Sequence, residues 1–183
     1  MHEFNPKNKK TQVISIGRFS EEKNLEFGIN VISKLNFPYH IIGNTKTKSN
    51  ILYFEKLESK IKKLELKSKI NLLKNIDRHK LVDYMNNSKV YFHCSNETFG
   101  ISVVESIAAG CIPIVPNTTA HKETVPKDDL RYKENDENDA KMKIEAALRG
   151  DFDKYLHELQ EHIKKFSEEN FHQSFLKIVE SLN

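Results

Sequence analysis

The chain has 183 residues, of which 38% are hydrophobic and 30% are charged, and this balance is typical of a globular protein. Such a length can bury an ordinary hydrophobic core, so the fold needs neither disulfides nor a structural metal. The formal net charge of +3 is too small to favour nucleic acid, and a modest positive field suits small anionic ligands better.

The cysteines, the histidines and the N-terminal residues indicate further which class of protein this chain belongs to. Cys94 and Cys111 lie in apolar segments without a C-x-x-C pair, and we interpret them as reduced core residues. Residues 1–11 contain no apolar run, so we expect neither a signal peptide nor a membrane span. The eight histidines form no H-E-x-x-H pattern, so no metal site is expected. We therefore expect a cytoplasmic protein, with any membrane contact at the inner surface.

Short apolar runs alternate with helical patterns as far as Pro126. Strands are predicted at 12–16, 39–42, 70–73, 90–93 and 112–115. Helices are predicted at 25–35 and 51–66, after Asp77, and after Gly100. Strands that alternate with helices and are apolar on both faces predict a parallel sheet that is covered on both sides. We expect an α/β fold with a Rossmann-like, doubly wound sheet.

The pattern changes after Pro126. Residues 127–139 are charged and are predicted to form a loop, and helices are predicted at 140–148, at 152–166 and from Ser167 onward. We expect a single domain over residues 1–183, with an α/β core at 11–126 and a loop with extra C-terminal helices at 127–183.

Glycines and polar residues follow four of the predicted strands directly. They fall at 17–18, 43–44, 74–75 and 95–100. Ligands of doubly wound sheets bind outside the carboxyl ends of the strands, where the strand order reverses. These residues therefore predict one binding site at one edge of the sheet.

Arg18 and Lys23 form the first candidate pair. Arginine offers a planar fork to phosphate oxygens, and lysine offers a mobile point charge, so together they suit a diphosphate. The alternative interpretation is two exposed cations at the start of a helix. The pair becomes specific only in combination with Glu97 and Glu105.

Glu97 and Glu105 lie eight residues apart across a predicted loop-to-helix junction. Free amides at a helix N-terminus bind anions, and Gly100 allows the backbone to approach a ligand closely. A carboxylate at 105, among apolar residues, is a natural acceptor for a ribose diol. The alternative interpretation is a glutamate on the helix surface.

Together these motifs resemble the C-terminal, nucleotide-sugar-binding half of a GT-B-fold retaining glycosyltransferase of the family 4 group. The resemblance covers residues 11–126. The segments that carry it are Gly17-Arg18 with Lys23, Glu97-x7-Glu105 around Phe99-Gly100, and Ala109-Gly110 before Ile112-Pro113-Ile114-Val115. The loop Asn117–His121 stands where the family often carries a glycine pair.

The resemblance implies a role for each matching residue. Arg18 and Lys23 would hold the donor diphosphate, and Glu97 would lie near the sugar hydroxyls, which makes these three the candidate catalytic residues. The remaining donor contacts that it implies are Gly17, Lys74, Asn75, Ile76, Phe99, Gly100, Ile101 and Glu105. Among these, the stretch 74–76 would face the base and Glu105 would bind the ribose.

The resemblance also implies the reaction and its partners. The chain would move a hexose, with mannose favoured, from GDP-mannose or a UDP-sugar to a glycan or lipid-linked acceptor, without a metal or other cofactor. An acceptor domain or subunit would have to be supplied from outside this chain, so transfer by the chain alone should be small.

Two other functions remain open. A non-catalytic nucleotide-sugar-binding subunit or sensor would bind the same ligand without transfer. An anion- or nucleic-acid-binding module would act through the lysines between 56 and 69. The simplest interpretation of these lysines is a solvated face, and the more specific interpretation is peripheral contact with a membrane surface. Asp151-Phe152-Asp153 matches the D-x-D of metal-dependent glycosyltransferases of another fold, and we interpret it as helix capping.

Overall fold

The computed structural model describes residues 10–167 and 169–170. Its strands are β1 (Lys10–Ile16), β2 (Tyr39–Gly43), β3 (Ile70–Lys74), β4 (Ser88–Phe92), β5 (Ile112–Pro116) and β6 (Arg131–Tyr132). Its α-helices are α1 (Leu25–Ser33), α2 (Lys48–Lys63), α3 (Arg78–Asn87), α4 (Ile101–Ala108), α5 (Thr119–Thr124), α6 (Glu137–Arg149) and α7 (Leu156–Ile163). The 3₁₀ turns are η2 (Glu21–Lys23), η3 (Asp128–Leu130), η4 (Asp153–Tyr155) and η5 (Lys164–Phe166).

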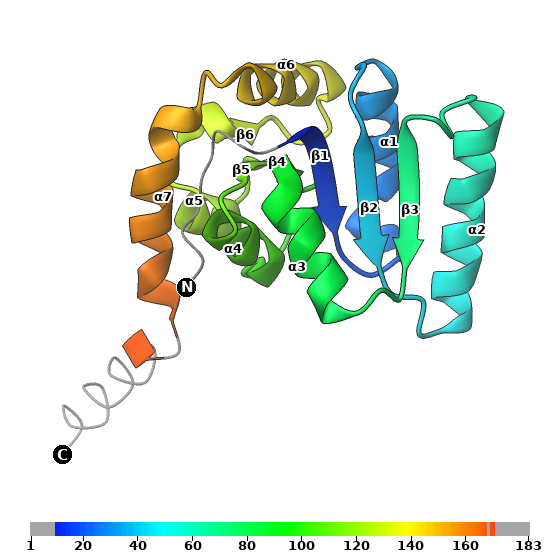
Figure 1. Cartoon of the computed structure of the whole chain (residues 1–183), viewed down its shortest axis with the longest axis horizontal. Coiled ribbons are helices and arrows are strands. Elements are labelled where there is room, and N and C mark those ends of the chain that lie inside the picture. The colour runs from blue at the N-terminus through cyan, green and yellow to red at the C-terminus, as the bar shows by residue number, and fades with distance from the viewer. Residues whose placement is uncertain (1–9, 168, 171–183) are drawn as a thin grey trace.

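The strands form one parallel sheet in the order β3-β2-β1-β4-β5-β6 (Figure 1). The order runs outward from β1 in one direction and then from β4 in the other, so it reverses between these two central strands. This arrangement confirms the predicted Rossmann-like, doubly wound α/β fold. It also places the crevice that binds ligands in such folds beside the carboxyl ends of β1 and β4.

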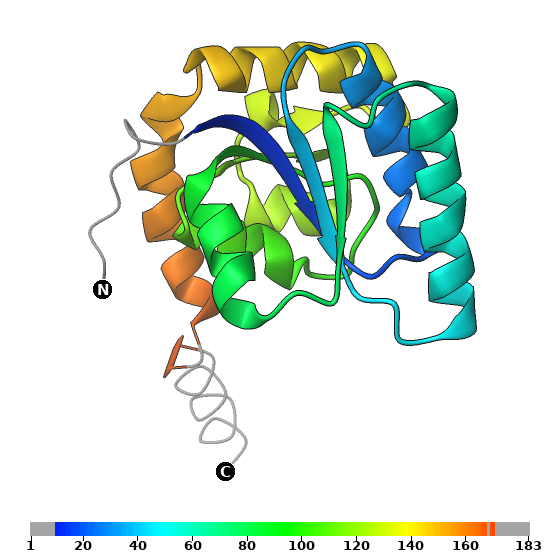
Figure 2. The ribbon, with the colours of Figure 1, turned by 45° about the vertical axis from the view of Figure 1, so that its right-hand side comes forward.

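Helices cover both faces of the sheet (Figures 1 and 2). On one face, α1 packs between α2 and α6, and α6 also contacts β4 and β5. On the other face, α3 contacts β1 and β4, while α4 packs against β5 and α7. Helices α6 and α7 therefore pack on different faces: α6 contacts the strands β4 and β5, and α7 contacts α4.

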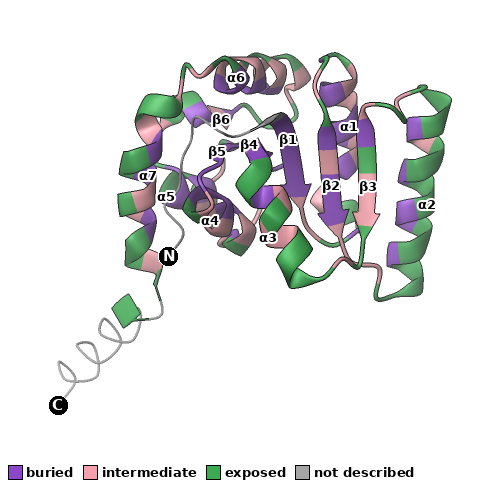
Figure 3. Ribbon diagram, viewed as in Figure 1, coloured by how far each residue is buried: buried purple, intermediate pink, exposed green. Residues whose placement is uncertain are grey.

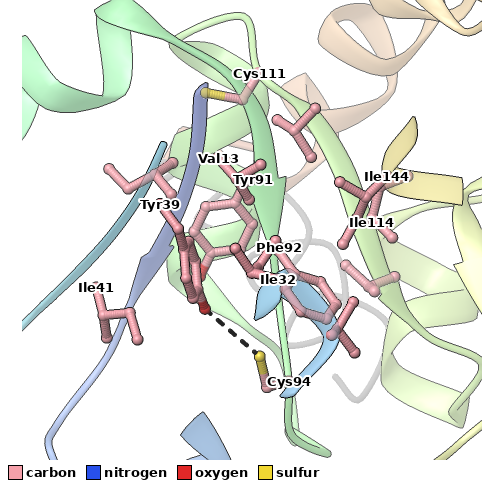
Figure 4. Close-up of a cluster of buried hydrophobic side chains, with 14 of the residues drawn as sticks. Val13, Ile32, Tyr39, Ile41, Tyr91, Phe92, Cys94, Cys111, Ile114 and Ile144 are labelled. Atoms are coloured by element: carbon pink, nitrogen blue, oxygen red, sulfur yellow. Dashed lines mark hydrogen bonds between the residues drawn. The ribbon is translucent and has the colours of Figure 1, made fainter. Parts of the chain in front are cut away.

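The core lies where β1, β4 and β5 meet the helices, and these strands are almost wholly buried (Figure 3). Tyr39 crosses this core, and its hydroxyl lies 2.6 Å from Ser15 Oγ and 4.0 Å from Cys94 Sγ (Figure 4). Burial raises the pKa of the Cys94 thiol to about 12. Cys94 and Cys111 are both buried free thiols, which confirms their interpretation as core residues.

Side-chain caps explain several helix ends. Thr47 and Asn50 form a capping box at the start of α2, so this helix begins three residues before its predicted start. Asp77 accepts a hydrogen bond from the Lys80 amide and caps α3, as predicted. Gly150 ends α6 with a φ of 99°, a left-handed conformation that favours glycine.

Three predictions for the second half of the chain were wrong. The predicted loop at 127–139 contains η3 and the short strand β6, in which Arg131 pairs with Val115 of β5. The loop after β5 winds into α5 from Thr119, and the single helix predicted at 152–166 is divided into η4, α7 and η5. A two-residue strand is too short to show alternation, so only its pairing partner identifies it. The helix predicted from Ser167 lies almost entirely outside the described residues.

Candidate functional site

Lys23 and Glu97 are 74 residues apart in sequence and form an ion pair at the carboxyl edge of the sheet. Lys23 comes from η2 after β1, and Glu97 comes from the loop after β4. Their side chains are only 18% and 20% exposed, so the pair is partly shielded from solvent. The strand order therefore brings the 17–23 motif and the 97–105 motif into direct contact.

His93 also contacts Glu97, and its Nε2 lies 3.4 Å from Glu97 Oε1. Hydrogen bonds from His93 and Lys23 lower the pKa of the Glu97 carboxyl to about 2. Burial lowers the pKa of His93, although Glu97 opposes this effect. Glu97 is therefore an ionised carboxylate at neutral pH, and it faces a neutral imidazole and an ammonium group.

His121 of α5 lies behind this cluster, with its ring 5.0 Å from that of His93. Its Nε2 is 3.3 Å from the carbonyl oxygen of Ser95, and it is completely buried. Burial, together with the neighbouring His93, lowers the pKa of His121 to about 4. Its ring is also in van der Waals contact with the position that a Cβ would occupy at Gly100. His121 therefore supports the loop rather than carrying a charge.

Arg18 points toward solvent and pairs with Glu22 in the next turn at 2.6 Å. The Arg18 side chain is 60% exposed, so it is free to turn toward a ligand. The structure places Arg18 and Lys23 at the same edge but does not bring their side chains into contact. The candidate diphosphate site therefore has one fixed and one exposed cation.

Glu105 lies on α4 with its side chain 32% exposed, and it pairs with Arg78 of α3 at 2.8 Å. The contact involves Glu105 Oε1. Because the carboxylate has a cationic partner already, the apolar sequence around it does not leave a buried unpaired charge. A diol that bound Glu105 would compete with Arg78 or share the carboxylate with it.

We expect Arg78→Ala to change the free energy of unfolding by less than about 1 kcal/mol, because exposed ion pairs contribute little. Urea unfolding of the wild type and the variant measures this difference. A loss above about 2 kcal/mol would show instead that Arg78 has a structural role that this exposed contact does not account for.

A cavity of about 220 Å³ opens beside Arg18, at the ends of β1, β2 and β3. Asn75 and Ile76 line it, as does Asn44, whose Oδ1 is buried without a hydrogen-bond partner in the described part of the chain. Lys74 does not line the cavity, because its ammonium group lies 4.4 Å from the centre of the Phe54 ring. Of the predicted stretch 74–76, two residues therefore reach the cavity.

The loop before α4 has the geometry of a close backbone approach. Gly100 precedes the helix with a φ of 83°, in the left-handed region that favours glycine. The first amides of a helix have no acceptor within the helix, so those of Ile101 and Ser102 are the candidates to bind an anion. The Val103 and Val104 amides donate to the Gly100 carbonyl oxygen, at 2.9 and 3.3 Å. Ile101 is 67% exposed, and Phe99 packs edge-on against Phe166 with ring centres 5.1 Å apart.

Three residues at the carboxyl edge of the sheet were not among the predicted site residues. His93 stands at the end of a predicted strand and four residues before Glu97, and these two positions were the available signals, although a histidine at a strand end is more often structural. Arg78 carried no signal, because its partner lies 27 residues away on another helix. Asn44 was noted only as a residue after a strand, and its unpartnered oxygen is visible only in the structure.

The remaining charged motifs form surface ion pairs. Asp151 pairs with Arg149 at 2.9 Å, and Asp153 pairs with Lys89 at 3.3 Å, at the junction of α6 and η4. Within the described residues, no group of three or more histidine, cysteine, aspartate or glutamate side chains is arranged to hold a metal ion. Over the same residues, no helix combines the length and apolar character needed to cross a membrane.

The lysines of α2 are partly neutralised by acidic neighbours. Lys56 contacts Glu21 at 3.0 Å and Glu26 at 2.6 Å, and Lys60 contacts Glu26 at 3.3 Å. The acidic partners come from η2 and α1, so these contacts join α2 to the neighbouring layer. This pairing reduces the positive field that the sequence pattern by itself indicates.

Comparison with protein families and curated proteins gives consistent matches. The profile of the family described as "Glycosyl transferases group 1" matches residues 1–169. The chain is 25% identical over 201 residues to GDP-Man:Man(3)GlcNAc(2)-PP-Dol alpha-1,2-mannosyltransferase of Dictyostelium discoideum and 27% identical over 188 residues to the Homo sapiens protein of the same name. These alignments cover 95% and 93% of the chain but 38% of each relative's length.

Solved structures show the same fold. Sucrose-phosphate synthase from Thermosynechococcus elongatus superposes with a TM-score of 0.81 at 19% identity, over 93% of this chain and 45% of that one. Anabaena Alr3699/HepE in complex with UDP and glucose also gives a TM-score of 0.81, at 15% identity, over 96% of this chain and 49% of that one. The fold is therefore that of the C-terminal domains of GT-B glycosyltransferases.

Proposed function

The chain belongs to the glycosyl transferases group 1 family, and from this premise we propose that it is the donor-binding domain of a retaining, family 4 glycosyltransferase. The proposed reaction moves mannose from GDP-mannose to a glycan or lipid-linked acceptor. The observation that carries the proposal is the convergence of the 17–23 and 97–105 motifs where the strand order reverses. The mannosyltransferase relatives support the choice of donor.

The donor has a place for each of its parts. The base would enter the 220 Å³ cavity, where Asn44 Oδ1 can accept a hydrogen bond from a ring N–H. The ribose would lie at Glu105, and the diphosphate would lie between Arg18, Lys23 and the first amides of α4. Lys23 would then contact the diphosphate on one side and Glu97 on the other, and Glu97 would face the sugar.

The chain's contribution to transfer would be electrostatic. Negative charge grows on the diphosphate as the bond to the sugar breaks, and Arg18, Lys23 and the helix amides would stabilise it. The ammonium group of Lys23 has three donors, so it can hold Glu97 and a phosphate oxygen together. The acceptor would bind outside this chain, which spans 38% of the length of these relatives.

Thermal unfolding with GDP, UDP, GDP-mannose and UDP-glucose tests the proposal. A ligand at a hundred times its Kd stabilises by about 2.7 kcal/mol, which is about 5–10 °C in Tm for a domain of this size. We expect this shift with the guanine nucleotides in the wild type and its loss in Glu105→Ala. Glu145→Ala is the matched control, because Glu145 also pairs with a cation on a helix, 3.6 Å from Lys141.

The outcomes separate the proposed function from its alternatives. A larger shift with the uracil nucleotides would keep the donor site and change the base. No shift with any nucleotide at millimolar concentration would contradict donor binding by this chain. A Tm shift that is retained in Glu105→Ala but decreases steeply as the salt concentration rises would favour an anion-binding module.

A further inference from the structure

The contact between His93 and Glu97 lies at the carboxyl end of β4, within the candidate site. His93 lies directly after β4 and is buried, with Nε2 3.4 Å from Glu97 Oε1 and Nδ1 3.2 Å from Tyr91 Oη. The Tyr91 hydroxyl lies 2.8 Å from Ser102 Oγ of α4. A chain of polar contacts therefore runs from α4 through β4 to Glu97, and Lys23 ends it on the η2 side.

The neighbours of His93 determine which ring nitrogen carries the hydrogen. An ionised carboxylate accepts hydrogen bonds but cannot donate one, so a hydrogen bond between Nε2 and Glu97 requires the hydrogen on Nε2. In a neutral imidazole, Nδ1 is then an acceptor, 3.2 Å from the Tyr91 hydroxyl. The single hydrogen of that hydroxyl also has Ser102 Oγ at 2.8 Å and the Ile16 carbonyl oxygen at 3.3 Å within reach. Ser95 Oγ is also 3.4 Å from Nε2, but a charged acceptor forms the stronger hydrogen bond.

The two oxygens of Glu97 have different environments. His93 and Lys23 both contact Oε1. Among the residues that the structure describes, no donor is bonded to Oε2, and the side chain is 20% exposed. One oxygen is thus held by the protein from two sides, and the other is available to a ligand.

We propose that His93 is a positioning residue, which fixes Glu97 through Oε1 so that Oε2 is presented to the hydroxyls of the donor sugar. This inference rests on the proposed function, since it assigns Glu97 to the sugar and not to the nucleotide. His93 does not touch the donor itself. Its effect should therefore appear only with ligands that carry the sugar.

Calorimetric titration of the whole chain with GDP and with GDP-mannose separates these effects. His93→Phe keeps a ring between Tyr91 and His121 but removes the N–H, and His93→Gln keeps an N–H donor. We expect His93→Phe to weaken GDP-mannose binding about tenfold and to leave GDP binding unchanged. We expect His93→Gln to stay within about threefold of the wild type for both ligands.

The outcomes distinguish the inference from the function on which it rests. If the wild type binds neither ligand, the proposed function fails first. If it binds both and His93→Phe weakens both equally, His93 supports the fold and the inference fails. If the wild type binds GDP-mannose no more tightly than GDP, no sugar contact exists for Glu97 to make, and the inference fails as well.

The ligand-free chain offers a second readout. Long-range ¹H–¹⁵N spectra distinguish the two neutral forms of histidine, and we expect His93 to carry its hydrogen on Nε2 at neutral pH. We expect Glu97→Gln, which replaces the charged acceptor, to shift the His93 nitrogen signals. A wild-type hydrogen on Nδ1 would contradict the inference independently of any binding experiment.

Discussion

Replacing Gly43 with alanine should destabilise the fold by about 3 kcal/mol or more, because the new Cβ would lie 1.9 Å from the carbonyl oxygen of Gly17. The Cβ is bonded directly to the Cα of one strand end, and the oxygen belongs to the backbone at the end of the adjacent strand, so neither can rotate away. The same Cβ would lie 3.2 Å from Phe19 in the core. Relief of this overlap must separate the two loops that line the cavity, so nucleotide binding should be lost together with stability.

Gly17→Ala is the matched control for this prediction. A Cβ at Gly17 would meet only carbons of the flexible Lys23 side chain, at 3.6–3.8 Å, which is ordinary van der Waals contact. We expect Gly17→Ala to lower the unfolding free energy by less than about 1 kcal/mol and Gly43→Ala to lower the Tm by about 6–12 °C. Similar values for the two variants in thermal and urea unfolding would contradict the close contact between the loops.

Glu97 should make the stability of the chain depend on pH in the acid range. Its pKa is about 2 in the folded chain and 4.5 in its unperturbed state, so folding favours the ionised form. The stabilisation is fully present above pH 4.5 and is lost as the pH falls from 4.5 to 2. After allowance for partial exposure, the shift corresponds to about 2–3 kcal/mol at neutral pH.

Urea unfolding of the wild type and Glu97→Gln at several pH values between 2 and 7 tests this prediction. Other carboxyls titrate in both proteins, so their effects cancel in the difference. We expect the two stabilities to differ by about 2–3 kcal/mol at pH 7 and to converge toward pH 2. Curves that remain parallel over this range would show that the Glu97 carboxyl gains nothing from its neighbours on folding.

A double-mutant cycle assigns this stabilisation to its partner. Lys23→Met keeps the stem of the side chain and removes the charge that Glu97 contacts. We expect a coupling energy above about 1 kcal/mol between Lys23→Met and Glu97→Gln at pH 7, and none near pH 2. Additive effects at both pH values would show that the contact between Lys23 and Glu97 does not contribute to the stability of the fold.

The sequence by itself determined the fold class and the edge of the sheet at which the candidate site lies. Continuous apolar runs such as 112–115 report burial on both faces of a strand, and their alternation with helical patterns requires parallel crossovers. The glycines after these runs then mark the strand ends. Local patterns carry this information because burial and helical period repeat within a few residues.

The tertiary structure alone decided which polar groups meet. The strand order puts the ends of β1 and β4 side by side, and only this neighbourhood pairs Lys23 with Glu97 and buries His93 beside them. Likewise, the contact of Arg78 with Glu105 depends on how α3 and α4 lie on the sheet. The strand β6 exists because β5 offers it a partner. These contacts join distant parts of the chain, so their formation depends on register and packing, which no local pattern records.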